Sequence, residues 1–295
     1  MASIPEEAIH RQPEATPAPA PRTVRRVVYR HTLPLRIMHW INAICLLVLL
    51  GSGLQIFNAH PALYWGQRSH FDHPWLMLGA TQSANGTLHG VTRLGSHRFD
   101  TTGWLGVSKE GGQQTVRGFP AWATIPGPQW LAMGRAWHFF FAWIFVINGV
   151  CFVAYALGTR HLTRDLVPTR RDWRGIGRSI VDHALLRHPH GEAALRYNVL
   201  QRLAYLGVIF VLGGGVVLMG LAMSPRMDSV LGWLVDLVGG RQSARSIHFL
   251  CAMGFIAFFL IHIFEVVVTG VGNNLRSIIT GRYAIEAEAR DETHQ

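Results

Sequence analysis

Four long apolar segments constrain this chain more than any other feature of its sequence. They cover residues 37–57, 133–157, 203–223 and 246–270. Each is long enough to cross about 30 Å of hydrocarbon as an α-helix, which rises about 1.5 Å per residue. Only 15% of the 295 residues are charged, whereas a soluble domain carries about 25%. The pattern predicts an all-α fold, an integral membrane four-helix bundle with a long outer loop between helices one and two.

The basic residues are distributed unevenly among the segments that flank these helices. Six arginines precede or open the first helix and nine lie in residues 160–202, but the longer segment 58–132 holds only five basic residues. Because positive residues accumulate on the cytoplasmic side, we expect a multi-pass protein of the inner (plasma) membrane with both termini in the cytoplasm. The net charge of +10 then reflects topology and attraction to membrane lipid, and it does not indicate nucleic acid.

The division of the chain follows from this topology. Residues 1–30 are expected to form a disordered cytoplasmic tail, because the first part of this segment is rich in Pro, Ala and Glu and lacks an apolar core. Residues 31–282 form the membrane domain, which includes the outer loop 58–132. Residues 283–295 form a cytoplasmic C-terminal tail with an acidic end.

The outer loop is unusually rich in tryptophan. A single tryptophan near the end of a membrane helix is ordinarily an interfacial anchor, but here several occur among Gly and Pro residues. We expect them to cap the outer face as a folded lid that offers a surface to a partner. The aromatic residues concerned are Trp65, Phe71, Trp75, Trp104, Phe119, Trp122 and Trp130.

Four histidines lie within or at the edge of the apolar segments, where ionisable groups are costly and are usually functional. His39 lies at the inner end of the first helix and His138 near the outer end of the second, and the fourth helix carries both His248 and His262. The fourteen residues between the last two turn a helix by about 1400° and raise it by about 21 Å, so both side chains share one face. His248 then lies at the depth of His138, and His262 approaches the depth of His39.

Two imidazoles at each of two depths are suited to iron in a b-type haem. Neutral imidazole is a good iron ligand, and helix bundles commonly enclose such sites. Two axial histidines leave no open position on the iron, which favours electron transfer over oxygen chemistry. No CxxC occurs, so covalent haem attachment is not indicated. Any one membrane histidine could instead bond a neighbouring helix. The histidines of the loops, His183 among them, carry less weight.

Small and basic residues accompany the four histidines. Glycines in helices one to three let helices pack closely in lipid, and they would also admit a flat macrocycle. Arg36, Arg135 and Arg245 lie near the histidines in sequence. They could pair with haem propionates or anchor the helix ends at the membrane edge, and the sequence favours neither role.

The stretch Arg36-Ile37-Met38-His39-Trp40, a histidine in the second helix and His248-x13-His262 together resemble the di-haem cytochrome b561-like family. This family includes the membrane subunits of nickel–iron hydrogenase, formate dehydrogenase and thiosulfate reductase. The resemblance covers residues 33–282, apart from much of the outer loop. It implies an inner haem b held by His39 with His262 and an outer haem b held by His138 with His248.

A second stretch, Arg196-Tyr197-Asn198-Val199-Leu200-Gln201-Arg202, resembles a Tyr-Asn-x-x-Gln segment beside the quinone of the formate dehydrogenase membrane subunit. The resemblance implies that Asn198 and Gln201 face a quinone near the inner haem. An amide can donate to a quinone carbonyl, but Asn is also a favoured residue at the start of a helix.

These observations predict an electron-transfer subunit and not a stand-alone catalyst. It would pass electrons between a periplasmic redox protein, on resemblance a molybdenum oxidoreductase, and the membrane quinone pool. An alternative within redox chemistry is a stand-alone superoxide:quinone oxidoreductase, which would need a small, positively charged outer funnel. An alternative of another class is a haem-free membrane anchor or transporter. Transporters commonly contain internal repeats, and no repeat is visible in the sequence.

Overall fold

The computed structural model describes residues 23–185, 187 and 197–288 of the chain. Four helical segments in this part are long and apolar enough to cross a membrane. They are α1 (Leu33–Phe57), α2 (Leu131–Gly158), α8 (Arg241–Val268) and a composite third segment, Val199–Ala222. The predicted all-α membrane bundle of four helices is confirmed. Each helix begins within a few residues of the predicted apolar segment.

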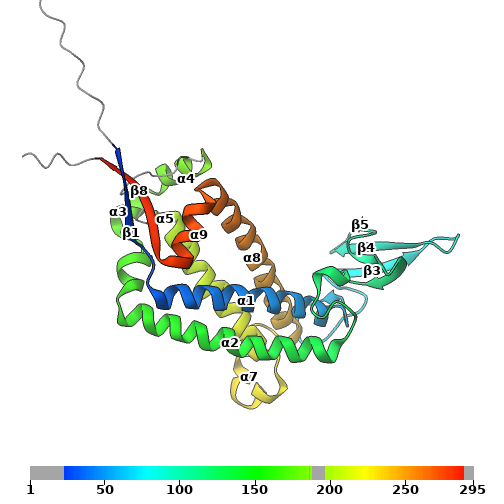
Figure 1. Ribbon diagram of the computed structural model, residues 1–295. Coiled ribbons are helices and arrows are strands. Elements are labelled where there is room, and N and C mark those ends of the chain that lie inside the picture. The colour runs from blue at the N-terminus through cyan, green and yellow to red at the C-terminus, as the bar shows by residue number, and fades with distance from the viewer. Residues whose placement is uncertain (1–22, 186, 188–196, 289–295) are drawn as a thin grey trace, which may run out of the picture.

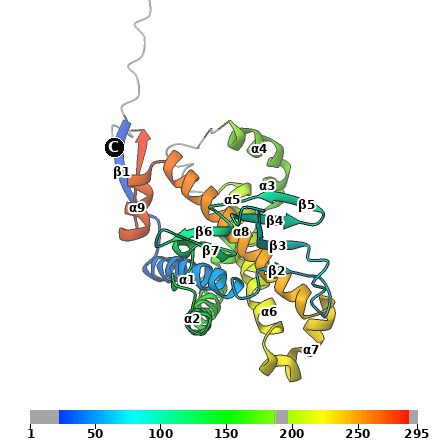
Figure 2. The ribbon, with the colours of Figure 1, turned by 90° about the vertical axis from the view of Figure 1, so that its right-hand side faces the viewer.

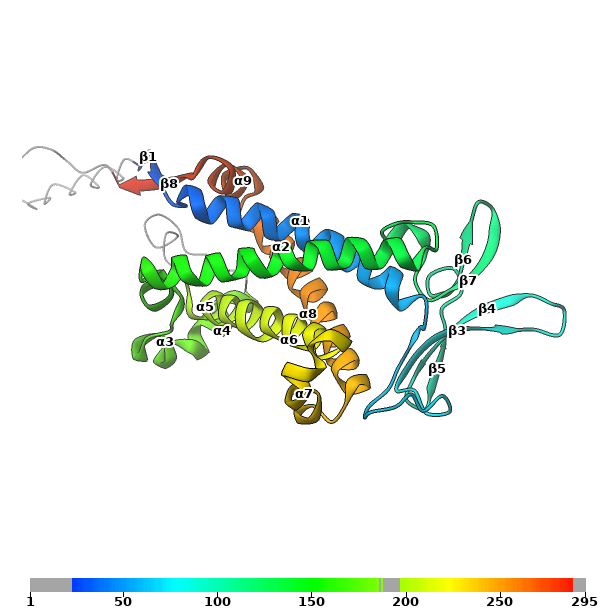
Figure 3. The ribbon, with the colours of Figure 1, turned by 90° about the horizontal axis from the view of Figure 1, so that it is seen from below.

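The third membrane segment is not one uniform helix. It consists of α5 (Val199–Leu206), a π-helical stretch (Gly207–Gly213) and α6 (Gly214–Ala222). Pairwise packing organises the bundle, with α1 against α2 and α6 against α8 (Figure 3). A Cβ added at Gly215 would lie 2.7 Å from the Cys251 sulfur. The glycine therefore allows the close approach of α6 and α8, as small residues do in membrane bundles.

The outer loop is folded as β-structure. Strands β2 (Ala62–Leu63), β3 (Leu76–Gln82), β4 (Leu88–Leu94) and β5 (His97–Asp100) form an antiparallel sheet in that order. Strands β6 (Gly106–Glu110) and β7 (Gln113–Arg117) form a separate hairpin, and a short 3-10 helix (Ala121–Ala123) follows. Figures 1 and 3 show these sheets beyond one end of α1 and α2.

Two buried contacts join the outer loop to the bundle. Trp75 donates from its indole nitrogen to Ser246 Oγ at 2.9 Å, and this hydroxyl donates to the Tyr64 carbonyl at 2.6 Å. Arg117, whose side chain is fully buried, donates to Gln55 Oε1 near the end of α1 and pairs with Glu110 Oε2, both at 3.1 Å. A buried charge needs such partners, so the loop is fixed in register on α1 and α8.

The tryptophans of the outer loop do not form one cap. Trp75 packs against the cluster formed by Phe57, Leu63 and Leu78 and stacks on Trp65. Trp104 and Trp122, in contrast, are exposed by 71% and 78%. These aromatic side chains therefore divide into some that pack within the chain and some that are exposed, and the predicted surface for a partner stays a prediction.

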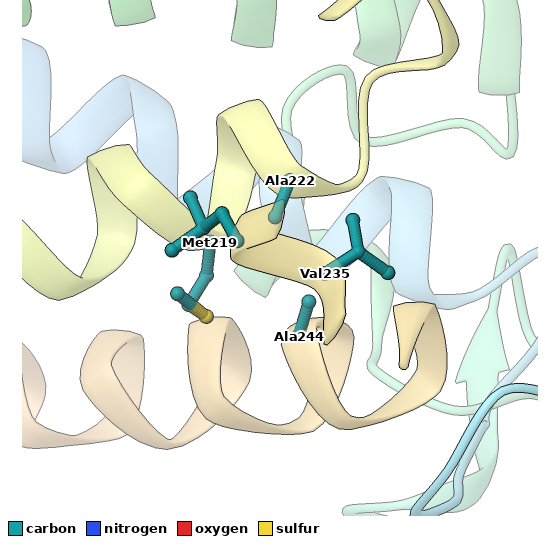
Figure 4. Packing of buried hydrophobic residues seen from close by; sticks show 5 residues of the cluster. Met219, Ala222, Val235 and Ala244 are labelled. Atoms are coloured by element: carbon teal, nitrogen blue, oxygen red, sulfur yellow. The ribbon is translucent and has the colours of Figure 1, made fainter. Parts of the chain in front are cut away.

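A small helix closes the outer side between the third and fourth membrane segments. Helix α7 (Asp228–Leu237) follows a short 3-10 turn (Pro225–Met227) and folds back on α6 and α8. Figure 4 shows the apolar cluster at this junction. Its buried members are Met219, Ala222, Leu234, Val235 and Ala244.

The opposite end carries the chain's terminal elements and the described part of the inner loop, the segment 160–202 between the second and third membrane segments. Strand β1 (Thr23–Tyr29) pairs antiparallel with β8 (Arg282–Glu288), and helix α9 (Val271–Thr280) leads into β8 (Figure 2). The inner loop contains a π-helical turn (Leu162–Leu166), α3 (Arg170–Arg174) and α4 (Ile176–Ala184). The segments that lead to the two termini therefore lie on the same side of the bundle.

The strand pair changes the predicted division of the chain. A disordered tail over residues 1–30 is wrong for residues 23–29, because these residues form backbone hydrogen bonds with residues 282–288. The predicted cytoplasmic C-terminal tail stays a prediction, and its first residues, 283–288, belong to this strand pair. The rest of both predicted tails, residues 1–22 and 289–295, lies outside the described residues.

Candidate functional site: two pairs of facing histidines

The outer pair joins α2 to α8. The ring centres of His138 and His248 lie 6.1 Å apart, with 62° between the ring planes. Ser52 donates its hydroxyl to the Val48 carbonyl at 2.6 Å, so its oxygen accepts from His138 Nδ1 at 3.1 Å. His248 Nδ1 donates to the Val216 carbonyl at 2.9 Å. With both protons fixed on Nδ1, the Nε2 atom of each ring keeps the lone pair that binds a metal.

The inner pair joins α1 to α8. The ring centres of His39 and His262 lie 6.4 Å apart, with 57° between the planes. Phe258 stacks on His262 at 5.7 Å, and Trp40 meets His39 edge-on at 5.5 Å. His39 Nδ1 is buried and has no hydrogen-bond partner among the described residues. Unlike the outer pair, this pair is oriented by aromatic packing.

The spacing in both pairs fits a metal ion between two imidazoles. An ion bound by one nitrogen of each ring at about 2.0–2.1 Å places the ring centres roughly 6 Å apart. Within the described part of the chain, no three His, Cys, Asp or Glu side chains gather at one point. Each pair is therefore a two-ligand site, which suits a metal whose other ligands come from a macrocycle.

Two glycines leave room beside the outer pair. A Cβ added at Gly53 would lie 3.4 Å from His138 Cε1, and one added at Gly220 would lie 3.6 Å from His248 Cε1. These distances are ordinary van der Waals contacts, so a larger side chain would occupy the space beside the ring. At the outer pair, the two imidazoles, their spacing and the space beside them fit a flat haem. At the inner pair, the two imidazoles and their spacing fit a haem.

The three arginines singled out from the sequence have different surroundings. Arg245 donates to the carbonyls of Ala62 and His60 at 2.9 and 2.6 Å, so it holds the outer loop on α8. Arg135 is exposed, and its guanidinium lies 5.7 Å from the Phe139 ring centre.

Arg36 lies close to the C-terminal elements. Its Nη2 donates to the Ile279 carbonyl at 2.5 Å, and its buried Nε has no partner among the residues described. Because one donor of this guanidinium is not used, the role of Arg36 toward a haem propionate stays a prediction.

Asn198 and Gln201 form a reciprocal cap at the start of α5. Asn198 Oδ1 accepts from the backbone N–H of Gln201 at 2.8 Å, and Gln201 Oε1 accepts from that of Asn198 at 3.2 Å. The capping role considered from sequence is therefore present. The cap uses the side-chain oxygens, whereas a quinone carbonyl would accept from the NH₂ groups, so the quinone role stays a prediction. Arg196, from the same stretch, lies outside the described residues.

Sequence reasoning missed one ionisable residue within α8. Glu265 lies three residues beyond His262, and its Oε1 is 3.3 Å from Nε2 of His183 on α4. A carboxylate within an apolar segment is costly and invites a functional explanation, so the signal was available. His183 carries little weight in the sequence, because nothing there places α4 beside α8.

The sequence also matches a family model, described as prokaryotic cytochrome b561, over residues 113–281. This is more than half of the chain and includes His138, His248 and His262, but not His39. The chain belongs to the prokaryotic cytochrome b561 family. It is a multi-pass membrane cytochrome that binds b-type haem.

One curated relative is the putative protein-methionine-sulfoxide reductase subunit YedZ1 of Azospira oryzae. The two sequences are 27% identical over 138 residues, which is 45% of this chain and 65% of the relative. The chain thus spans just under two thirds of the length of this relative. No solved structure matches the chain.

Proposed function

We propose that this chain holds two b haems, one between His39 and His262 and one between His138 and His248, and that it carries electrons through the membrane between an outer redox partner and quinone. The observation that carries this proposal is the pair of facing imidazoles at each of two levels, with ring centres 6.4 and 6.1 Å apart. Helix α8 contributes one histidine to each pair.

The residues around the pairs support such a role. A haem held by the two imidazoles of a pair would supply one-electron transfer. The Ser52 oxygen and the Val216 carbonyl hold the outer rings in one tautomer and orientation, and such partners also make a ligand more basic.

The outer partner is proposed to dock on the face formed by the outer loop. The exposed Trp104 and Trp122 support this, because exposed aromatic side chains are common at protein interfaces. The relative is named as a subunit of a protein-methionine-sulfoxide reductase, which favours a periplasmic reductase as the partner. A molybdenum oxidoreductase stays the first candidate, and electrons would then run outward from quinol.

The proposed orientation places β1 and β8 in the cytoplasm and the sheets of the outer loop in the periplasm of an inner membrane. Both terminal strands lie at the end opposite the sheets, which agrees with this arrangement. Quinone would then meet the inner pair from the cytoplasmic half of the bilayer, near the cap formed by Asn198 and Gln201.

A spectrum and a haem assay test the proposal. The purified chain reduced with dithionite should show the α band of low-spin b haem, with about two haems per chain. A content of one haem per chain would contradict the di-haem arrangement. Affinity purification from native membranes should recover an outer-face redox protein. A chain that oxidises superoxide at full rate without a partner would favour the stand-alone alternative.

A further inference from the structure

The pair formed by His183 and Glu265 connects the inner loop to the region of the inner histidines. The His183 side chain is exposed by 35% and the Glu265 side chain by 21%. The histidine is therefore the more accessible member of the pair. Three residues along a helix correspond to a rise of about 4.5 Å. Glu265 therefore lies just beyond His262, on the side of the inner loop.

Helix α4 also brings His183 close to the proposed quinone region. This helix packs against α5, the helix that Asn198 and Gln201 cap. The same short helix therefore contacts the start of the third membrane segment and the inner end of the fourth. Figure 1 shows α4 and α5 at the end of α8 that continues into α9. An ionisable pair thus lies where an electron carrier and a quinone would meet.

We infer that His183 and Glu265 form the path by which protons move between the cytoplasm and the quinone. This inference rests on the proposed function and assigns its proton step. Histidine exchanges protons readily near neutral pH, and the contact between His183 Nε2 and Glu265 Oε1 lets a proton pass from the more exposed to the less exposed side chain. The path runs in the opposite direction when quinol is oxidised.

A quinone that becomes a quinol takes up two electrons and two protons, and no bond between heavy atoms breaks. The two proposed haems would supply one electron each and would be oxidised. The two protons come from the cytoplasm, each passing from His183 to Glu265 and then to a quinone oxygen, and His183 is reprotonated from water after each transfer.

The test uses the purified full chain with its haems. The protein is reduced with limiting dithionite and mixed rapidly with a short-chain benzoquinone, and the loss of the haem α band is followed. A pH-indicator dye reports proton uptake in the same mixture. Ferricyanide, which accepts an electron without a proton, serves as the comparison oxidant. The variants are His183→Gln and Glu265→Gln, which keep hydrogen-bonding side chains but do not carry protons.

Oxidation by quinone should slow about 10²-fold in both variants, since this is a typical contribution of a positioned acid or base. Dye-detected proton uptake should slow equally, and oxidation by ferricyanide and haem content should not change. Imidazole in the buffer should restore part of the rate in His183→Gln. The matched control is His161→Gln, because His161 forms a similar pair with Asp165, at 2.7 Å, in the inner loop. Its rate should stay within about twofold of wild type.

The outcomes separate this inference from the proposed function. If quinone oxidises His183→Gln and Glu265→Gln at the wild-type rate, the proton path is wrong and the proposed function stands. If ferricyanide oxidises the wild-type protein but quinone does not, the quinone role is wrong, and the proton path falls with it. If His183→Gln loses haem, the rate at which quinone oxidises Glu265→Gln tests the proton path by itself. A loss of rate with both oxidants would show a structural role and would also overturn the inference.

Discussion

The two histidine pairs have nearly the same spacing but very different surroundings. In the outer pair, both Nδ1 atoms have hydrogen-bond partners, the Ser52 oxygen and the Val216 carbonyl. In the inner pair, His39 Nδ1 has none among the described residues. Ionisable groups accumulate near the inner pair instead: Glu265 follows one of its histidines along α8 and pairs with His183.

This difference agrees with the proposed function, in which the outer pair relays electrons and the inner pair exchanges them with quinone. A site that only relays electrons benefits from rings held in one orientation, because little then has to move when the charge changes. A site that exchanges electrons with quinone must also exchange protons, and this needs titratable groups nearby. The outer pair has the first character, and the inner pair has the second.

Loss of one histidine should remove one haem and leave the other. His138→Ala and His248→Ala should each lower haem content from about two to about one per chain and should leave the same residual spectrum. His39→Ala and His262→Ala should leave the complementary spectrum. Transfer from the outer partner to quinone should fall below detection in all four. Haem assay and redox titration measure this, and a shared spectrum for His138→Ala and His39→Ala would contradict the pairing.

Filling the space beside the outer pair should have nearly as large an effect. Gly220→Val adds methyl groups where a Cβ would already lie 3.6 Å from His248 Cε1, so the outer haem should be lost and the inner haem retained. The matched control is Gly149→Val in α2, because no atom lies within 4 Å of a Cβ added there. The control should keep both haems. If Gly220→Val also keeps both, the macrocycle does not occupy this space.

Removal of a ring's hydrogen-bond partner should have a smaller effect that is confined to the outer site. Ser52→Ala removes the hydroxyl oxygen that accepts from His138 Nδ1, and loss of such a partner typically costs about 10–100-fold in metal affinity. The outer haem should be lost more readily during washing, and the midpoint potential of the outer haem should change. The inner haem of the same protein is the control. An equal change in both haems would contradict the assigned role of Ser52.

The membrane helices could be predicted because each one depends mainly on residues that are close together in the sequence. A span of about twenty apolar residues must satisfy its backbone within the helix, so length and hydropathy are enough to place α1, α2 and α8. The proximity of His39 to His262 followed from helix geometry and topology. The third segment was also found, but its π-helical stretch at Gly207–Gly213 was not.

The parts that were missed depend on contacts between distant residues. The outer sheets are fixed by pairs such as Gly79 with Val91, and the order of strands is not visible in a short alternating pattern. The strand pair of the two terminal segments joins residues more than 250 positions apart in the chain. The proximity of His183 to Glu265 likewise depends on how α4 folds back on α8. A short stretch of sequence does not predict this packing.

The smallest predicted effect concerns His31, just before α1. Burial, and next the positive charge of Arg30, lowers the pKa of His31 to about 4 from its ordinary 6.5. The folded state therefore binds this proton less well than the unfolded state. The stability that depends on neutral His31 is complete above about pH 6.5 and decreases as the pH falls toward 4.

Thermal unfolding at pH 7.5 and at pH 5 tests the role of His31. The wild-type melting temperature should be lower at pH 5, and in His31→Gln this difference should shrink by a few degrees, given that 1 kcal/mol corresponds to about 2–4 °C at this size. The matched control is His97→Gln, because His97 is exposed on β5; its response should equal that of wild type. The inner haem should be released first on acidification, because His31 precedes the helix that carries His39. Earlier release of the outer haem would contradict this account and would make the inner end the more rigid of the two.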